Sequence, residues 1–248
     1  MAAILLYHAV SADVTDPSLQ VSAEKPVQHL AWCVQLGYRF SSLDDVLTTS
    51  EERLVAVTFD DGLISIDSTL RDLLDRGVTP TVFLCPGMVG SENTWASPGR
   101  IRERLFNWNE LRTLRDLGVS FGCHGWDHRA FVGRDPRELS HDLDRCLESF
   151  ACELKVQPRV FSWPFGLFDE AAFEVVSRFF RWGLSVGLEW GEDIRSRAIP
   201  RLIVDQSTSF DAFADELELK EFRLLETPCP LDFGGLLGFN RGTRLREG

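Results

Sequence analysis

Two short segments of this chain carry side chains that suit a hydrolytic metal site. The first ends in Asp60-Asp61-Gly62, so that two carboxylates directly follow the apolar run Leu54–Phe59. The second places His124 and His128 four residues apart, either on one face of a helix or across a turn. A catalytic zinc site uses imidazole nitrogens and carboxylate oxygens as three protein ligands and keeps a position open. Asp61, His124 and His128 are therefore the candidate ligands of a catalytic metal ion.

Each segment also has an ordinary structural explanation. An Asp-Gly pair after a strand is common in turns, and the two histidines fit one surface residue and one capping residue. Two adjacent acids at a buried strand end raise one of their pKa values unless a cation intervenes. His124 and His128 are also two of only five histidines in the chain. These two points favour one bound divalent ion, with Zn²⁺ as its expected identity.

The hydrophobic pattern of the rest of the sequence predicts the strands and helices that must position these side chains. Seven short β-branched or aliphatic runs predict buried strands, at Ile4–Tyr7, Leu54–Phe59, Thr81–Leu84, Val119–Gly122, Val160–Ser162, Gly183–Val186 and Ile199–Val204. Amphipathic stretches between them predict helices, at Ile64–Arg76, Asn109–Leu117 with Asn109 as the cap, Asp135–Leu154 and Glu170–Phe180. Alternating strands and helices indicate a mostly parallel sheet, either open or closed into a barrel.

The candidate residues follow the strands in a consistent way. His8, Asp60, His124 and the segment Trp163–Phe165 each come just after the carboxyl end of a predicted strand. In a parallel α/β sheet these ends lie on one side, where active sites are built. The long segment Gly90–Phe106 is predicted to be a loop over one end of the sheet.

Composition excludes several other classes of protein. The chain has 248 residues, of which 44% are apolar, and a formal net charge of −12. That acidity argues against binding nucleic acid through its phosphates, and 18 Phe and 7 Trp argue against disorder. No apolar run approaches the roughly 20 residues of a membrane-spanning helix. Nothing in the sequence selects an oligomeric state.

The ends of the chain and its cysteines give an expectation about location. The first residues contain no basic segment, apolar stretch or cleavage site of the kind that marks a secretory signal. The six cysteines are scattered and include no Cys-x-x-Cys pair, which is typical of reduced thiols. We therefore expect a cytoplasmic protein. We expect residues 1–226 to form one catalytic domain and residues 227–248, rich in Pro and Gly, an irregular tail.

The motifs resemble those of the polysaccharide deacetylases, also called the NodB-homology or carbohydrate esterase 4 family. The resemblance covers residues 4–205 in the family's order. It rests on Thr58-Phe59-Asp60-Asp61-Gly62, His124-x-x-x-His128, Trp163-Pro164-Phe165-Gly166, the opening Leu5-Leu6-Tyr7-His8 and the segment Gly37–Asp45.

This resemblance implies a single-domain, distorted (β/α) barrel of about seven parallel strands and a divalent metal, usually zinc. By position, Asp61, His124 and His128 would hold the metal, and Asp60 would be the general base. The backbone N–H of Phe165 would help to bind the oxyanion. Trp163 and Trp190 are candidates to line the substrate pocket, with core packing as the alternative for each.

The chain departs from the family at two positions. Many members carry an arginine in the third motif that holds the catalytic aspartate, and Ser162 stands there instead. Arg201 is the candidate replacement, with a surface salt bridge as the alternative. The family's general acid is a histidine near the last strand, but no histidine follows His141. His8 is the candidate acid, with a buried structural role as its alternative, and Asp60 acting as both base and acid is the second solution.

The expected function is thus a metal-dependent deacetylase that hydrolyses N-acetyl groups of an amino sugar or glycan precursor, in surface polysaccharide biosynthesis. One alternative is hydrolysis of the C–N bond of a small non-sugar amide. The other is a carbohydrate-binding protein that has lost turnover. An acetylated amino sugar is the expected partner.

Overall fold

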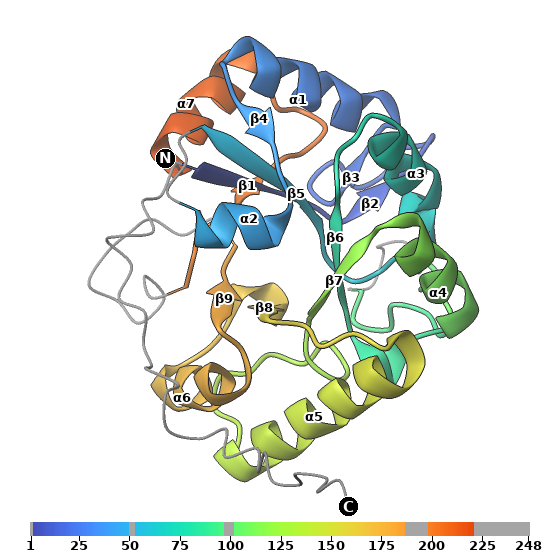
Figure 1. The fold of residues 1–248 in the computed structure, drawn as a ribbon, viewed down its shortest axis with the longest axis vertical. Helices are drawn as coiled ribbons and strands as arrows, with labels where there is room; N and C mark the ends of the chain where they lie inside the picture. The colour runs from blue at the N-terminus through green and yellow to red at the C-terminus, as the bar shows by residue number, and fades with distance from the viewer. Residues whose placement is uncertain (1, 50–52, 97–101, 187–197, 221–248) are drawn as a thin grey trace, which may run out of the picture.

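The computed structural model describes residues 2–49, 53–96, 102–186 and 198–220 of the chain (Figure 1). Its main sheet contains eight parallel strands: β1 (Ala2–Tyr7), β4 (Arg39–Phe40), β5 (Leu54–Phe59), β6 (Thr81–Leu84), β7 (Ser120–Cys123), β8 (Val160–Ser162), β9 (Trp182–Leu184) and β10 (Leu202–Ile203). Seven of them follow one another in space as β10-β1-β5-β6-β7-β8-β9, and β4 pairs beside the start of β5. A second, two-stranded sheet pairs β2 (Ala9–Val10) with β3 (Gln20–Val21).

The main sheet curls into the distorted barrel expected from the sequence. β10 pairs with β1, and a parallel bridge joins Leu184 at the end of β9 to Ile199, three residues before β10. Backbone hydrogen bonds from Ser185 N to Ile199 O and from Ile199 N to Gly183 O support this bridge. The two edges of the seven-strand path therefore meet across the segment that leads into β10.

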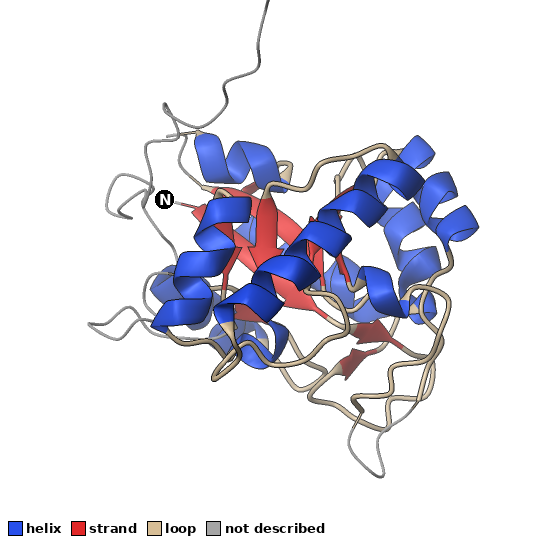
Figure 2. Cartoon of the chain, turned by 90° about the horizontal axis from the view of Figure 1, so that it is seen from below, coloured by secondary structure: helices blue, strands red, loops and turns tan. Residues whose placement is uncertain are grey.

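Helices connect the strands and lie around the sheet (Figure 2). They are α1 (Glu24–Gln35), α2 (Leu43–Thr48), α3 (Asp67–Asp75), α4 (Trp108–Leu117), α5 (Pro136–Ser149), α6 (Glu170–Phe179) and α7 (Phe210–Lys220). α5 continues into a π-helical turn at Phe150–Leu154, which divides the single helix that we predicted over residues 135–154. Among the described residues, no helix combines the length and apolarity needed to cross a bilayer.

The cap of α4 differs from the prediction. The side chain of Asn107, and not that of Asn109, accepts hydrogen bonds from the first turn, at Asn109 N and Glu110 N. Glu110 in turn accepts from the Asn107 backbone N–H, which completes a capping box. The prediction was wrong because it started the helix one residue late, after Trp108. Residues 227–248, for which we predicted an irregular tail, lie outside the described residues.

Two apolar layers follow from the alternation of side chains along the strands. One set of strand residues faces the helices and forms the larger core, which includes Leu5, Val57 and Phe161. The alternate set fills the barrel interior, and its buried apolar members include Ile4 and Phe83. The carboxyl end of this interior is where the candidate residues gather.

Candidate active site

The same alternation places the candidate residues at the mouth of the barrel. In β5, Leu54 and Ala56 face the interior, so the period of two carries Thr58 and then Asp60 to the same side. Tyr7 and Cys123 belong to the outer core. His8 and His124, which follow them, therefore come to the inner side at the ends of β1 and β7. Three strands thus bring together polar groups that are far apart in the sequence.

Asp61, His124 and His128 converge as the sequence predicted. One ligand atom from each lies within 4.8 Å of the others. Asp61 Oδ1 is 3.0 Å from His128 Nε2 and 3.4 Å from His124 Nε2. All three side chains are buried. His124 and His128 do not lie on a helix; they meet across the turn after β7, which was one of the two arrangements that we considered.

The donor set fits a divalent cation. Asp61 Oδ1 is buried and has no hydrogen-bond partner among the described residues, although a buried polar atom normally has one. His124 Nδ1 lies 2.8 Å from the Ser162 carbonyl oxygen. If Nδ1 carries the proton and donates to this oxygen, Nε2 presents its lone pair toward Asp61, which is the usual way in which a metal-binding imidazole is oriented. A cation between these atoms would satisfy Asp61 and explain the arrangement.

Arg201 holds Asp60, as we expected of a replacement for the missing arginine. Its guanidinium makes two hydrogen bonds to the carboxylate, from Nη1 to Oδ1 at 2.8 Å and from Nη2 to Oδ2 at 2.7 Å. Ser162 adds a third: its hydroxyl donates to Asp60 Oδ2 at 3.0 Å and accepts from Arg201 Nη2 at 2.7 Å. The alternative of a surface salt bridge is wrong, because Arg201 is 0% and Asp60 1% exposed.

Arg201 reaches Asp60 from the inside of the barrel. It precedes β10, and its Nε donates to the Ser185 carbonyl at 3.2 Å while Nη1 also donates to Thr58 Oγ1 at 3.3 Å. Its guanidinium lies over the Phe83 ring, 5.4 Å from the centroid. Ser162 stands where the resemblance led us to expect an arginine, and its small hydroxyl leaves room for a guanidinium that enters from the segment before β10.

These contacts fix the charge state of the two aspartates. Burial raises the pKa of Asp60, but the Arg201 guanidinium and the nearby His124 outweigh it and lower this pKa to about 2. Burial likewise raises the pKa of Asp61, and His128 and His124 hold it well below its usual range. Both groups are therefore carboxylates at neutral pH, one able to bind a cation and the other able to accept a proton.

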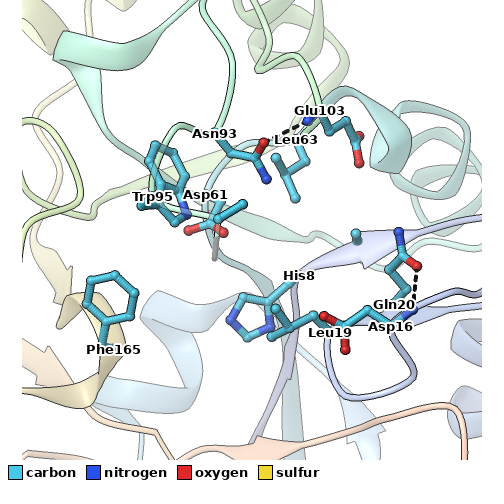
Figure 3. A pocket seen from close by; sticks show the side chains of 12 residues that line it. His8, Asp16, Leu19, Gln20, Asp61, Leu63, Asn93, Trp95, Glu103 and Phe165 are labelled. Atoms are coloured by element: carbon cyan, nitrogen blue, oxygen red, sulfur yellow. Dashed lines mark hydrogen bonds between the residues drawn. The ribbon is translucent and has the colours of Figure 1, made fainter. Parts of the chain in front are cut away.

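A cavity of about 310 Å³ opens beside Asp61 (Figure 3). Twelve residues line it: His8, Ala9, Asp16, Leu19, Gln20, Asp61, Leu63, Asn93, Trp95, Ala96, Glu103 and Phe165. They come from the ends of the strands, from the segment around β2 and β3, and from the long loop that follows β6. Figure 3 shows Trp95 and Phe165 on one side of Asp61 and the amides and acids Gln20, Asp16 and Glu103 on the other.

The cavity includes some of the predicted site residues and excludes others. His8 and Phe165 lie on its wall, and Phe165 is 53% exposed. Trp163 is 0% exposed and stacks on Phe168 in the outer core, with ring centroids 4.2 Å apart. Of the two alternatives that we gave for Trp163, the structure therefore shows core packing and not substrate contact, because the residue directly after β8 lies on the helix-facing side. Trp190 lies outside the described residues.

Sequence reasoning missed the wall contributed by the long loop. We predicted a loop at Gly90–Phe106 but assigned no role to any of its residues. Trp95 is packed face to face with His128, with ring centroids 4.2 Å apart and planes inclined by 16°. A tryptophan in an otherwise polar loop, Ser91 to Ala96, was the available signal.

Comparison with known proteins agrees with this geometry. The chain is similar in structure to IcaB from Ammonifex degensii, with a TM-score of 0.72 and 20% identity over 86% of this chain and 95% of that one. It is similar to a de-N-acetylase from Aggregatibacter actinomycetemcomitans (TM-score 0.71, 18% identity, 86% and 98% covered). A third such structure is the deacetylase PplD of Streptococcus pyogenes in complex with acetate (0.70, 17%, 89% and 98%).

These structures are too distant in sequence to show more than a shared fold. The comparison with curated proteins found no match. A family model described as polysaccharide deacetylase matches residues 48–179, which is more than half of the chain and includes the aspartate pair, both histidines and the third motif. The chain belongs to the polysaccharide deacetylase family.

Proposed function

We propose that this protein is a metal-dependent deacetylase that hydrolyses the N-acetyl group of an amino sugar in a glycan or glycan precursor. The observation that carries the proposal is the convergence of Asp61, His124 and His128 beside a separate, ionised Asp60. Asp60 Oδ2 lies 3.8 Å from His124 Nε2, so the base and the ligands share one small volume. Two of the similar structures are named a de-N-acetylase and a deacetylase in complex with acetate.

Asp61, His124 and His128 would hold the ion, and Zn²⁺ suits two imidazoles and a carboxylate. When bound, a zinc ion supplies Lewis-acid polarisation of a carbonyl and lowers the pKa of water. Asp60 takes a proton from the attacking water, and Arg201 keeps Asp60 deprotonated and fixed in orientation until then. Water adds to the acetyl carbon, the C–N bond breaks, and acetate and a free amine leave.

The residues on the cavity wall complete the reaction. His8 is placed to deliver the proton that the departing amine needs, and its cavity-facing position supports this role. The backbone N–H of Phe165 is proposed to donate to the developing oxyanion; Phe165 has a left-handed backbone (φ 58°) and lines the cavity. We further propose a role in the biosynthesis of a surface polysaccharide. The cytoplasmic location stays a prediction.

The test is release of acetate from N-acetylhexosamine oligosaccharides and sugar nucleotides, with and without a chelator. We expect acetate from at least one of these substrates, loss of activity after chelation and recovery with Zn²⁺. Asp60→Asn should lower kcat by a factor of about 10²–10⁴ and leave the amount of bound zinc unchanged.

Three results would contradict the proposal. Acetate release by a metal-free protein would refute the metal-dependent mechanism. Absence of acetate from every sugar, with hydrolysis of a small non-sugar amide, would move the protein to the alternative substrate class. If the wild-type protein binds sugars without any turnover, and Asp60→Asn leaves this binding unchanged, the protein is a carbohydrate-binding protein and not an enzyme.

A further inference from the structure

The two histidines of the site are held in different ways. The Nδ1 of His124 lies within hydrogen-bonding distance of a backbone carbonyl, that of Ser162. The Nδ1 of His128 is buried and has no hydrogen-bond partner among the residues that the structure describes. Metal-binding histidines almost always donate this second N–H to a carbonyl, a carboxylate or water, because that contact fixes the ring and its tautomer. Among the described residues, the contacts that can orient His128 are therefore those of neighbouring rings.

Aromatic rings of the described residues surround the His128 imidazole. Trp95 lies parallel to it, at 4.2 Å and 16°, and the Phe165 ring meets it at 4.5 Å and 80°. His124 approaches at 4.9 Å and 65°. The parallel contact with Trp95 defines the plane of the imidazole, and the steep contact with Phe165 limits movement within the site.

The loop that carries Trp95 is itself fixed. Asn93 bonds to Glu103 through its backbone N–H (3.0 Å) and through its side-chain oxygen (2.7 Å). The indole packs against a small apolar cluster that contains Ala9, Leu63 and Leu105. Hydrogen bonds of the loop and apolar packing of the indole therefore fix Trp95, so that it can hold the His128 ring in place.

We propose that Trp95 is a positioning residue for the metal ligand His128, and that its ring stacking fixes the orientation of the imidazole. This rests on the proposed function, since it assumes that His128 binds a metal. Trp95 also lines the substrate cavity. The Trp95 indole thus contacts both the cavity and the metal ligand His128. Because the loop after β6 carries this indole, we expect the position of the loop to affect how tightly the site binds its ion.

The test measures zinc affinity directly, by competition between the apoprotein and a chromophoric chelator. Trp95→Leu should weaken zinc binding by about tenfold or more, the range found when outer contacts of metal ligands are removed. Trp95→Phe, which retains an aromatic face, should recover most of the affinity. The d–d absorption of the Co²⁺-loaded protein should change in Trp95→Leu and return toward the wild-type spectrum in Trp95→Phe.

Trp32→Leu is the matched control. Trp32 also contacts an imidazole, that of His29, with centroids 5.0 Å apart, but this pair packs against Phe213 of α7 and does not line the cavity. We expect this variant to bind zinc with wild-type affinity. Circular dichroism confirms folding of each variant. If Trp95→Leu does not fold, the comparison of Trp95→Phe with Trp95→Met decides, with tighter zinc binding by the Phe variant expected.

The outcomes separate this proposal from the proposed function. Wild-type zinc affinity in Trp95→Leu would overturn the positioning role, and so would an equal loss in Trp95→Leu and Trp95→Phe. A wild-type protein that binds neither zinc nor cobalt would refute the metal-dependent function itself.

Discussion

Replacing Arg201 by methionine tests the central electrostatic feature of the site. Methionine fills much of the same length but removes the charge and both hydrogen bonds to Asp60. The carboxylate would then be left at 1% exposure with the Ser162 hydroxyl as its remaining close donor. Because a buried charge without a partner is costly, the variant should be much less stable than the loss of two ordinary hydrogen bonds suggests.

The expected loss can be given a size. Breaking a buried ion pair by removing one partner lowers the free energy of unfolding by about 3–5 kcal/mol. Asp60→Asn in the same chain removes the stranded charge, so the double variant Asp60→Asn/Arg201→Met should recover at least half of that loss. The matched surface control is Arg71→Met, which breaks an equally bidentate pair with Asp67. Those partners are 44% and 35% exposed, and the expected loss is below about 1 kcal/mol.

Urea unfolding of the metal-free proteins at pH 7, followed by tryptophan fluorescence, measures these differences. The reasoning would be refuted if Arg201→Met lost no more stability than Arg71→Met. It would also fail if the double variant were no more stable than Arg201→Met alone, because the stranded charge would then not be the cause.

The same pair predicts how stability depends on pH. The pKa of Asp60 is lowered from 3.8 to about 2, so the unfolded chain binds this proton more readily than the native protein does. The stabilisation, on the order of 2 kcal/mol, is complete above pH 3.8 and is lost as the pH falls toward 2. In the Asp60→Asn variant this part of the acid dependence should be absent.

Two further predictions concern the proton donor and the helix that follows the long loop. His8→Gln should slow acetate release while bound zinc stays unchanged. Burial lowers the pKa of His8 from 6.5, although Asp61 nearby raises it. The fraction of protonated His8, and the part of the rate that depends on it, should therefore decline as the pH rises through a value below 6.5. A pH–rate profile of His8→Gln identical to that of the wild type would remove His8 from the mechanism. Asn107→Ala should cost about 1 kcal/mol of stability, measured by urea unfolding, because it removes the acceptor for Asn109 N and Glu110 N; an unchanged midpoint would show that the cap is not needed.

The central strands were predictable because their signal is local. The predicted bounds of β5, β6 and β8 are the observed ones, since each is a mostly apolar run that is buried over its whole length. α1 was missed because its buried side includes Pro26 and His29, which break the apolar pattern of a helix. β2 and β3 were missed because two residues each carry no recognisable period.

The contacts of the site were less predictable than its residues. The motifs identified Asp60, Asp61, His124 and His128. The resemblance also made Arg201 the candidate to hold Asp60, but a surface salt bridge stayed open as the alternative, because the two residues are 141 positions apart and meet only once the barrel closes. Trp163 shows the opposite case. Its place in the third motif suggested a substrate contact, whereas the alternation of β8 directs it into the outer core.

The backbone conformation of three site residues depends on the surrounding barrel. Asp61 (φ 72°), His128 (φ 59°) and Phe165 (φ 58°) all adopt the left-handed region, which is unusual for residues other than glycine. Each such residue costs of order 1–3 kcal/mol and persists only where the surrounding structure imposes it. Here the imposing structure is the barrel mouth, where three separate loops turn sharply to aim a carboxylate, an imidazole and an aromatic ring at one point. Asp and His tolerate this region better than most residues other than glycine and asparagine, whereas the sequence gives no local sign of it at Phe165. Stability of the barrel and geometry of the ligands are therefore linked, and a variant that relaxes any of these turns should lose the ion before it loses the fold.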